Sequence, residues 1–250
     1  MLKIDNISFS YNNKKVLKSI SLNAKNTEIT ALLGKNGSGK TTLLKIINKF
    51  LKADSGQVFI DNKDINYIRR KDIAKLVGYC PQQTTHVMLT VYETVLCGRI
   101  VYNKYFLSKK DREIVDKTLE FTGLKDFSHR NLNQLSGGEF QKVIIARALA
   151  QKPKILLLDE PINNLDIKSQ YDMMNLILKI TKELEITTVI VLHDINIASK
   201  YADRFIILNN GCVMASGNQD ILTSEVIEKA FNIKVEVKYI NNNPFILPAT

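Results

Sequence analysis

The chain has 250 residues, of which 45% are hydrophobic and 24% charged, a composition that suits one large α/β domain and excludes a wholly disordered chain. Its net charge of +10 predicts an anionic partner but does not separate nucleic acid, lipid and nucleotide. The apolar runs fall short of the about 18 residues of a membrane span, the N-terminus lacks the pattern of a secretory signal, and three widely separated cysteines favour reduced thiols in a cytosolic protein.

The first part of the chain is expected to open with antiparallel strands and then to change to a strand, a loop and a helix. Residues 2–9 and 16–22 have strand composition and flank a polar turn at Asn12. From residue 29 an apolar run enters a glycine-rich loop, and apolar side chains at helical spacing follow over residues 40–51.

The rest of the chain alternates helical and strand patterns. Residues 90–121 lack a strong β pattern and are expected to form a helical segment. The apolar runs 155–158 and 187–192 frame a helical pattern over residues 166–185, as expected of a parallel sheet that is covered on both faces. The chain is then expected to form a hairpin over 204–216, a helix over 224–231, a strand over 234–240 and a polar bend.

The segment from Gly34 to Thr41, Gly-Lys-Asn-Gly-Ser-Gly-Lys-Thr, fits the pattern of a phosphate-binding loop and lies between a predicted strand and a predicted helix, as that pattern requires. Its backbone N–H groups, the helix N-terminus and the Lys40 ammonium would hold phosphate oxygens, and the Thr41 hydroxyl would bind Mg²⁺. The candidate nucleotide-binding residues here are Gly34, Lys35, Asn36, Gly37, Ser38, Gly39, Lys40, Thr41 and Thr42.

A second pattern is the apolar run from Ile155 that ends in two carboxylates, Asp159 and Glu160. Ligands of open α/β sheets bind at the carboxyl ends of the strands. Asp159 is placed to hold the Mg²⁺ hydration shell, and Glu160 to orient or deprotonate a water that attacks the γ-phosphate. Many strands end in an acidic residue, so this pattern alone is weak evidence. It indicates a nucleotide site because the phosphate-binding loop at Gly34 is present in the same chain.

A third pattern, Leu135-Ser136-Gly137-Gly138-Glu139, opens a predicted helix. The free N–H groups of a helix start, together with a serine hydroxyl, make an anion site. The chain therefore carries two phosphate-binding devices for one nucleotide.

With these three motifs the sequence resembles, over essentially the whole chain, the nucleotide-binding subunits of ATP-binding cassette (ABC) transporters. The resemblance implies an α/β fold: a P-loop NTPase core with a mostly parallel sheet, an antiparallel β subdomain, and a helical subdomain that carries the signature motif. It also implies a single ABC ATPase domain over 1–250, with a catalytic core and antiparallel region in 1–88 and 151–217, a helical subdomain in 89–150 and a short C-terminal extension in 218–250.

The resemblance assigns roles that residue types alone do not. Tyr11 matches the aromatic residue that stacks on adenine, Gln82 the glutamine that contacts Mg²⁺ and water, and His193 the histidine that touches the γ-phosphate. The expected catalytic residues are thus Glu160, His193 and Gln82; the metal site comprises Thr41, Gln82 and Asp159; and the nucleotide site adds Tyr11, Ser136, Gly137, Gly138 and Asp166 to the loop.

Some positions depart from the family's usual pattern. Ile162 stands where threonine is common, Asn163-Asn164 replaces a more frequent serine-containing pair, and Lys142 replaces an arginine. Each of these departures leaves the expected catalytic groups in place, and the effect expected from them is on the fine geometry of the subunit interface.

The resemblance further implies a head-to-tail homodimer with ATP and Mg²⁺, in which Ser136 and the Gly137 and Gly138 amides of one subunit cap the nucleotide held by the other. Substituting Glu160 by Gln is then expected to retain ATP and trap the closed dimer. The implied partners are integral membrane permease subunits and, indirectly, a substrate-binding protein, with the ATPase peripheral on the cytoplasmic side of the cell membrane.

The segment from Leu89 to Arg99 is similar to subunits that energise uptake of ferric siderophores, haem and cobalamin, and a cassette without a fused span favours an importer. An importer of another solute is one alternative. A soluble ABC ATPase acting on nucleic acid is a second, supported by the net charge but opposed by scattered basic residues without interleaved aromatic side chains, so direct nucleic-acid binding is not expected.

Overall fold

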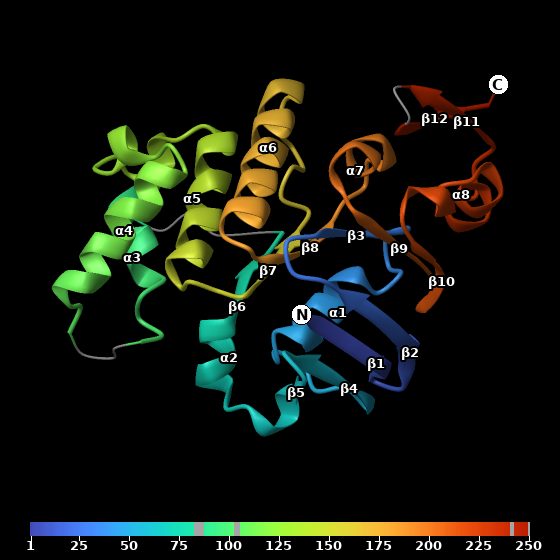
Figure 1. Ribbon diagram of the computed structural model, residues 1–250, viewed down its shortest axis with the longest axis horizontal. Helices are drawn as coiled ribbons and strands as arrows, with labels where there is room; N and C mark the ends of the chain where they lie inside the picture. The colour runs from blue at the N-terminus through green and yellow to red at the C-terminus, as the bar shows by residue number, and fades with distance from the viewer. Residues whose placement is uncertain (83–87, 103–105, 241–242, 250) are drawn as a thin grey trace.

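The computed structural model describes residues 1–82, 88–102, 106–240 and 243–249. A six-stranded sheet crosses the middle of the molecule, and a four-stranded sheet lies below it in the view of Figure 1. The large sheet has the order β10 (Cys212–Gly217), β9 (Arg204–Asn209), β3 (Ile29–Leu33), β8 (Thr187–Val191), β7 (Ile155–Asp159) and β6 (Val77–Cys80). The small sheet has the order β2 (Lys14–Ala24), β1 (Leu2–Tyr11), β4 (Ser55–Ile60) and β5 (Lys63–Asp64).

The large sheet is parallel except for its edge strand β10, which pairs antiparallel with β9. The small sheet is antiparallel. Both observations confirm the architecture expected from the sequence. The hairpin expected over 204–216 is β9 and β10, joined at Asn210 and Gly211, whose φ angles of 48° and 78° are those of a tight hairpin turn.

The apolar run of β7 is buried on both faces because layers cover the large sheet on each side. Ile155 and Leu157 face a cluster formed with α1 (Lys40–Ile47) and the small sheet, so α1 lies between the two sheets (Figure 1). Leu156 and Leu158 face the opposite cluster. That cluster includes residues of α5 (Gly137–Ala150), α6 (Ile167–Glu183), α7 (Ile195–Tyr201) and α8 (Ser224–Phe231).

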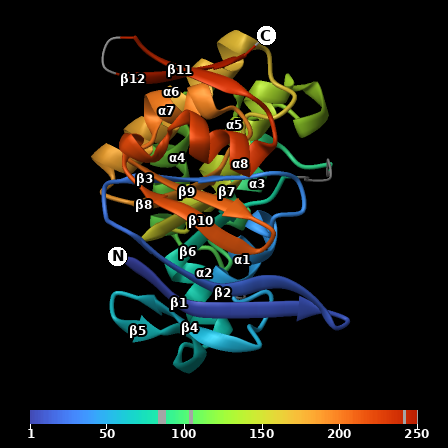
Figure 2. The same ribbon diagram turned by 90° about the vertical axis from the view of Figure 1, so that its right-hand side faces the viewer.

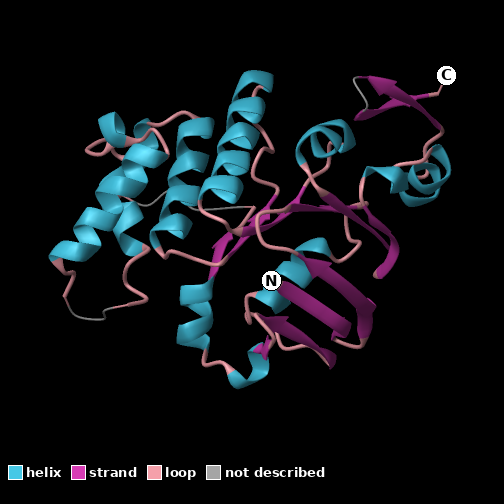
Figure 3. Ribbon diagram, viewed as in Figure 1, coloured by secondary structure: helices cyan, strands magenta, loops and turns pink. Residues whose placement is uncertain are grey.

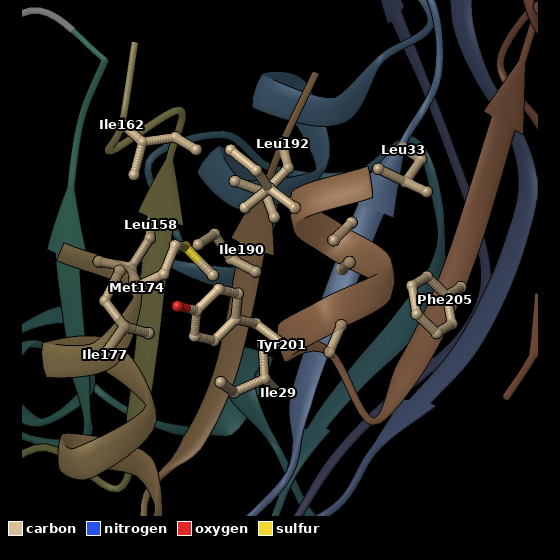
Figure 4. Packing of buried hydrophobic residues seen from close by; sticks show 14 of the residues in the cluster. Ile29, Leu33, Leu158, Ile162, Met174, Ile177, Ile190, Leu192, Tyr201 and Phe205 are labelled. Carbon is tan, nitrogen blue, oxygen red and sulfur yellow. The ribbon is translucent and has the colours of Figure 1, made fainter. Parts of the chain in front are cut away.

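Figure 4 shows the packing of this second cluster around Met174 and Tyr201. Met174 and Ile177 of α6 are fully buried against the sheet. Tyr201 is 7% exposed, and its hydroxyl donates to Asn175 Oδ1 at 2.9 Å. A buried tyrosine with its hydroxyl paired adds apolar contact area without leaving an unsatisfied donor.

A helical region on the left of Figures 1 and 3 comprises α3 (Val91–Cys97), α4 (Lys109–Phe121) and α5, which share a core of their own. The helical segment expected over 90–121 consists of two helices, α3 and α4. The first helix ends before Gly98. A Cβ on Gly98 would lie 2.2 Å from the carbonyl oxygen of Arg147, so a larger residue would clash with α5 there. The second helix begins at a capping box between Ser108 and Asp111.

After β11 (Val235–Ile240) the chain forms a further strand, β12 (Asn243–Pro248), which the sequence did not predict; of the polar bend expected there, residues 241–242 lie outside the described part. Figure 2 shows this hairpin beside α7. The Asn196 side chain joins them, accepting from the backbone N of Ile246 at 2.7 Å and donating to its carbonyl at 3.1 Å. The remaining elements are α2 (Arg70–Leu76) and 3₁₀ turns at Ile65–Tyr67, Lys125–Phe127, Leu132–Gln134 and Gln219–Ile221.

Among the described residues, the helices are all too short or too polar to cross a bilayer.

Candidate active site

The glycine-rich loop joins β3 to α1, as expected. Gly34, Gly37 and Gly39 have φ angles of 141°, 79° and 104°, a region that favours glycine. At Gly34 a Cβ would also lie 2.2 Å from the carbonyl oxygen of Leu208 on β9. The loop can pass this strand only because it has glycine there, and its N–H groups then precede the N-terminus of α1.

Lys40 is folded back onto this loop. It is 5% exposed, and its Nζ donates to the carbonyl oxygens of Gly34 at 2.7 Å and Lys35 at 2.9 Å. Burial lowers the pKa of Lys40, while the nearby charges of Glu160 and Asp159 act in the opposite direction. The ammonium therefore lies against the loop, where its partners among the described residues are these two carbonyl oxygens.

Asp159 lies behind the start of α1. Its carboxylate is 1% exposed and accepts from the Thr41 hydroxyl at 3.1 Å and from the Tyr79 hydroxyl at 3.4 Å. Burial is the main cause of a raised pKa at Asp159, with Glu160 adding to it and the two hydroxyl donors opposing it. Tyr79 was not among the predicted site residues, because it belongs to no motif and only the sheet order brings it to Asp159.

Three of the predicted residues follow three neighbouring parallel strands, so their side chains meet at one edge of the sheet. Gln82 lies just beyond β6, Glu160 follows β7 directly, and His193 lies just beyond β8. Glu160 is the centre of this group. Its Oε1 lies 2.6 Å from His193 Nε2, and its Oε2 accepts from Gln82 Nε2 at 2.6 Å.

A further donor to Glu160 is Asn163, whose side-chain Nδ2 also contacts Oε2. Glu160 itself has a left-handed φ of 55°, a conformation that costs a non-glycine residue free energy and is typical of functional sites. Its side chain is 8% exposed and that of His193 36%. The carboxylate is therefore held by three side chains at the rim of a cavity.

That cavity has a volume of about 790 Å³ and is lined by Tyr11, Lys14, Val16, Asn36, Gly37, Gly39, Lys40, Thr41, Thr42, Gln82, Glu160, Asn163 and His193. Most of the predicted loop residues, Tyr11 and the three predicted catalytic residues thus share one space. Tyr11 is 43% exposed, and its ring stands edge-on to Phe9 with the centroids 4.7 Å apart. Gly34, Lys35, Ser38 and Asp159 are absent from the lining.

Ser38 lies just under the loop surface. Its side chain is 3% exposed, and its hydroxyl has no hydrogen-bond partner among the described residues. A buried hydroxyl without a partner is costly, so the loop gains free energy from an acceptor placed there, as a phosphate oxygen would be.

The third motif, from Leu135 to Glu139, lies outside this cavity. The Ser136 hydroxyl accepts from the Glu139 backbone N at 3.3 Å and donates to Glu139 Oε2 at 2.8 Å, a capping box that starts α5. At Gly138 a Cβ would lie 3.3 Å from Ser169 Oγ, and Ser169 in turn bonds to Asp166, the N-cap of α6. Ser136, Gly137, Gly138 and Asp166 therefore gather at the N-termini of α5 and α6 and stay outside the cavity lining.

Comparison with known sequences identifies the family. Residues 17–163 match the ABC transporter family. An uncharacterized ABC transporter ATP-binding protein of Methanocaldococcus jannaschii is 42% identical over 99% of this chain and 98% of its own length. The petrobactin import ATP-binding protein YclP of Bacillus subtilis is 35% identical over 97% of both chains. A phosphonates import ATP-binding protein of Oceanobacillus iheyensis is also 35% identical, over 94% of this chain and 96% of its own length.

Solved structures agree with this result. A chain in an inward-facing structure of a metal-chelate type ABC transporter has a TM-score of 0.86 and 26% identity, covering 100% of this chain and 97% of that chain. A dimeric ATP-binding cassette bound to ADP and phosphate has a TM-score of 0.76 and 34% identity over 87% of this chain and 98% of that chain. The chain belongs to the ABC transporter family, as one of its ATP-binding proteins with a P-loop ATPase fold.

Proposed function

We propose that this chain is the ATPase subunit of an ABC importer for ferric siderophores or related metal chelates, and that it works as a head-to-tail homodimer with Mg²⁺. The catalytic part rests on one observation: the Glu160 carboxylate stands at the rim of the phosphate-binding cavity with its Oε1 2.6 Å from His193 Nε2. A carboxylate in that position can accept a proton from a water beside a bound γ-phosphate.

The proposed reaction uses the chain's own residues for binding, orientation and proton transfer. The loop N–H groups and Lys40 hold the phosphates. The water oxygen bonds to the γ-phosphorus, the bond from that phosphorus to the bridging oxygen breaks, and the water proton passes to Glu160, leaving ADP and phosphate. His193 orients the water that Glu160 deprotonates.

The residues around Thr41 fit a magnesium ion. The Thr41 hydroxyl and the Asp159 carboxylate are oxygen donors 3.1 Å apart, and Gln82 offers a further amide oxygen. Oxygen donors are the ligands that Mg²⁺ prefers, and it commonly takes only one or two carboxylates and completes its shell with phosphate and water. When bound, it would offset the charge of the phosphates. The described residues contain no cluster of three or more His, Cys, Asp or Glu that could hold a metal ion.

The separation of Ser136 from the cavity supports the dimer. The start of α5 and the phosphate-binding loop of one subunit serve different nucleotides in a head-to-tail pair, as the self-complementary interface of a twofold-symmetric dimer allows. The similar cassette that is dimeric with ADP and phosphate also supports this arrangement. Within each subunit we assign 1–88 and 151–217 to the catalytic core, 89–150 to the helical subdomain and 218–250 to a C-terminal extension.

The cargo is assigned from relatives. The petrobactin import protein and the metal-chelate type transporter chain support an iron-chelate importer, as does the segment from Leu89 to Arg99. The partners are then permease subunits and, through them, a substrate-binding protein, with the ATPase on the cytoplasmic face of the membrane. Phosphonate import is the competing assignment because that relative has equal identity.

A growth experiment separates the two cargoes. A strain lacking this gene is grown with a ferric siderophore as the sole iron source, and separately with a phosphonate as the sole phosphorus source. The proposal predicts a defect on the siderophore that is restored by the wild-type gene and not by the Glu160→Gln variant. A defect confined to phosphonate would overturn the cargo assignment and leave the ATPase assignment intact.

A further inference from the structure

We infer that Asn163 is a positioning residue for ATP hydrolysis: its side-chain amide fixes one oxygen of the Glu160 carboxylate and leaves the other beside His193. The inference rests on the proposed role of Glu160. In the sequence, Asn163 is notable only because it belongs to a pair that replaces a more common serine-containing one. In the structure, its side chain contacts Glu160.

The contact is built into the loop after β7. The backbone N of Asn163 donates to the carbonyl of Glu160 at 3.3 Å, which closes a four-residue turn, and from this turn the Asn163 Nδ2 reaches Glu160 Oε2. Gln82, the other donor to Oε2, comes from a different strand. Asn163 therefore keeps its position relative to Glu160 whatever happens at the end of β6.

The two oxygens of Glu160 have different surroundings. Oε2 receives amide donors from Gln82 and Asn163, whereas Oε1 lies beside His193 at 2.6 Å. The terminal torsion of a glutamate is broad, so an unheld carboxylate samples many orientations. With Oε2 fixed, Oε1 keeps a defined direction, and orientation of this kind contributes to the rate of a proton transfer.

An asparagine suits this task better than the serine usual in the family. The nitrogen of its side-chain amide is only a donor, whereas a serine hydroxyl both donates and accepts and sits on a shorter side chain. Asn163 is half-buried and lines the cavity, so its amide is shielded from much of the competing water.

Steady-state hydrolysis of ATP by Asn163→Ala tests the inference. We expect kcat to fall roughly ten- to a hundredfold, the loss of one oriented hydrogen bond to a charged group, while KM for ATP stays within about twofold of the wild type. The kcat of Asn163→Ser should lie between those of the wild type and Asn163→Ala. The matched control is Asn23→Ala, which removes an exposed asparagine on β2 and should hydrolyse ATP as the wild type does.

A double-variant cycle separates positioning from a purely structural role. Single-turnover hydrolysis is measured for Glu160→Gln with and without Asn163→Ala, and thermal unfolding is recorded for every variant. Since Asn163 acts through Glu160, its substitution should have no further effect in the Glu160→Gln background. If Asn163→Ala does not fold, the same cycle is run with Asn163→Ser.

Three results would overturn the role of Asn163. These are an unchanged kcat, a raised KM with unchanged kcat, and an equal fold-loss in the Glu160→Gln background. A wild-type chain without any ATPase activity would instead overturn the proposed function itself, and a fast Glu160→Gln variant would overturn the role of Glu160.

Discussion

The Thr41 hydroxyl donates to the Asp159 carboxylate at 3.1 Å and so joins the start of α1 to the end of β7 across 118 residues of sequence. Asp159 is buried, and the burial raises its pKa. A buried carboxylate is stable only when hydrogen bonds or a cation compensate its charge. The pair would therefore offer two oxygen ligands to the proposed magnesium ion.

Removing this hydroxyl is expected to weaken the response to Mg²⁺. Thr41→Val keeps the shape of the side chain but leaves Asp159 with one donor fewer, at a cost of about 1–3 kcal/mol. We expect a higher Mg²⁺ concentration for half-maximal hydrolysis and a lower kcat. Thr41→Ser retains the hydroxyl and should behave almost as the wild type. Equal Mg²⁺ dependence in the two variants would contradict the assignment of Thr41 as a ligand.

Tyr11 is expected to contribute to binding of the adenine base. Its half-exposed ring at the cavity rim is braced by Phe9, and stacking on a base is worth about 1–3 kcal/mol. Tyr11→Ala should therefore raise the Kd for ATP about five- to a hundredfold, measured by calorimetry, whereas Tyr11→Phe should preserve it. An unchanged Kd in Tyr11→Ala would contradict stacking of adenine on Tyr11.

Complementation tests whether the site is shared between subunits. Lys40→Ala and Ser136→Ala should each be inactive alone, the first in the phosphate-binding loop and the second in the motif at α5. In a head-to-tail dimer of one Lys40→Ala and one Ser136→Ala subunit, both defects fall on the same site and the other site is intact. Random mixing should then restore about a quarter of the wild-type activity.

The control for that mixture is each variant at the same total concentration. A mixture as inactive as its components would show that Ser136 serves the cavity of its own subunit.

The buried pair of Arg99 and Asp111 predicts a pH-dependent stability of the helical region. Arg99 Nε lies 2.9 Å from Asp111 Oδ1, with side-chain exposures of 6% and 4%, and Arg99 also donates to the Ala150 carbonyl at 2.6 Å. Asp111→Ala leaves the Arg99 charge buried without its partner, so we expect a loss of about 3–5 kcal/mol in the free energy of unfolding at neutral pH. Urea denaturation measures this loss.

The sign of the pH effect follows from the lowered pKa. Hydrogen bonds from Ser108, together with the Arg99 pair, lower the pKa of Asp111 to about 2, below its value of about 4 in the unfolded chain. The stabilisation is therefore complete above about pH 4 and decreases as the pH falls toward 2. Asp111→Ala should accordingly approach the wild type in stability at the acidic end. A constant difference between pH 5 and pH 2 would contradict this account.

Sequence patterns predicted the long apolar strands and the motif-bearing loops, because burial on both faces and glycine-rich turns leave clear signals. They did not predict β6, a strand of four residues that contains Gly78. Glycine lowers strand propensity, but it packs closely here, since a Cβ at this position would lie 3.1 Å from Pro153 Cγ. The predicted helix over 40–51 also ends early, at Ile47, where Lys49 has a left-handed φ of 57°.

The site shows the same division. Gln82, Glu160 and His193 are predicted one by one, but their meeting depends on the order β6, β7, β8 in the sheet, which the chain order of the motifs does not reveal. Tyr79 and Asn163 enter the site through side-chain hydrogen bonds alone. The Tyr79 contact depends on the tertiary arrangement, whereas the Asn163 contact is local to the turn after β7, and neither leaves a periodic signal along the sequence.

The most direct test of the account is the oligomeric state of Glu160→Gln with ATP and Mg²⁺, measured by size-exclusion chromatography with light scattering. Because Glu160 is assigned to the attacking water and Lys40 to phosphate binding, this variant should bind ATP, hydrolyse it very slowly and elute as a stable dimer. Adding Ser136→Ala to the same chain should return it to the monomer. A Glu160→Gln chain that stays monomeric with ATP, or that turns ATP over as fast as the wild type, would contradict hydrolysis by Glu160 at a shared interface.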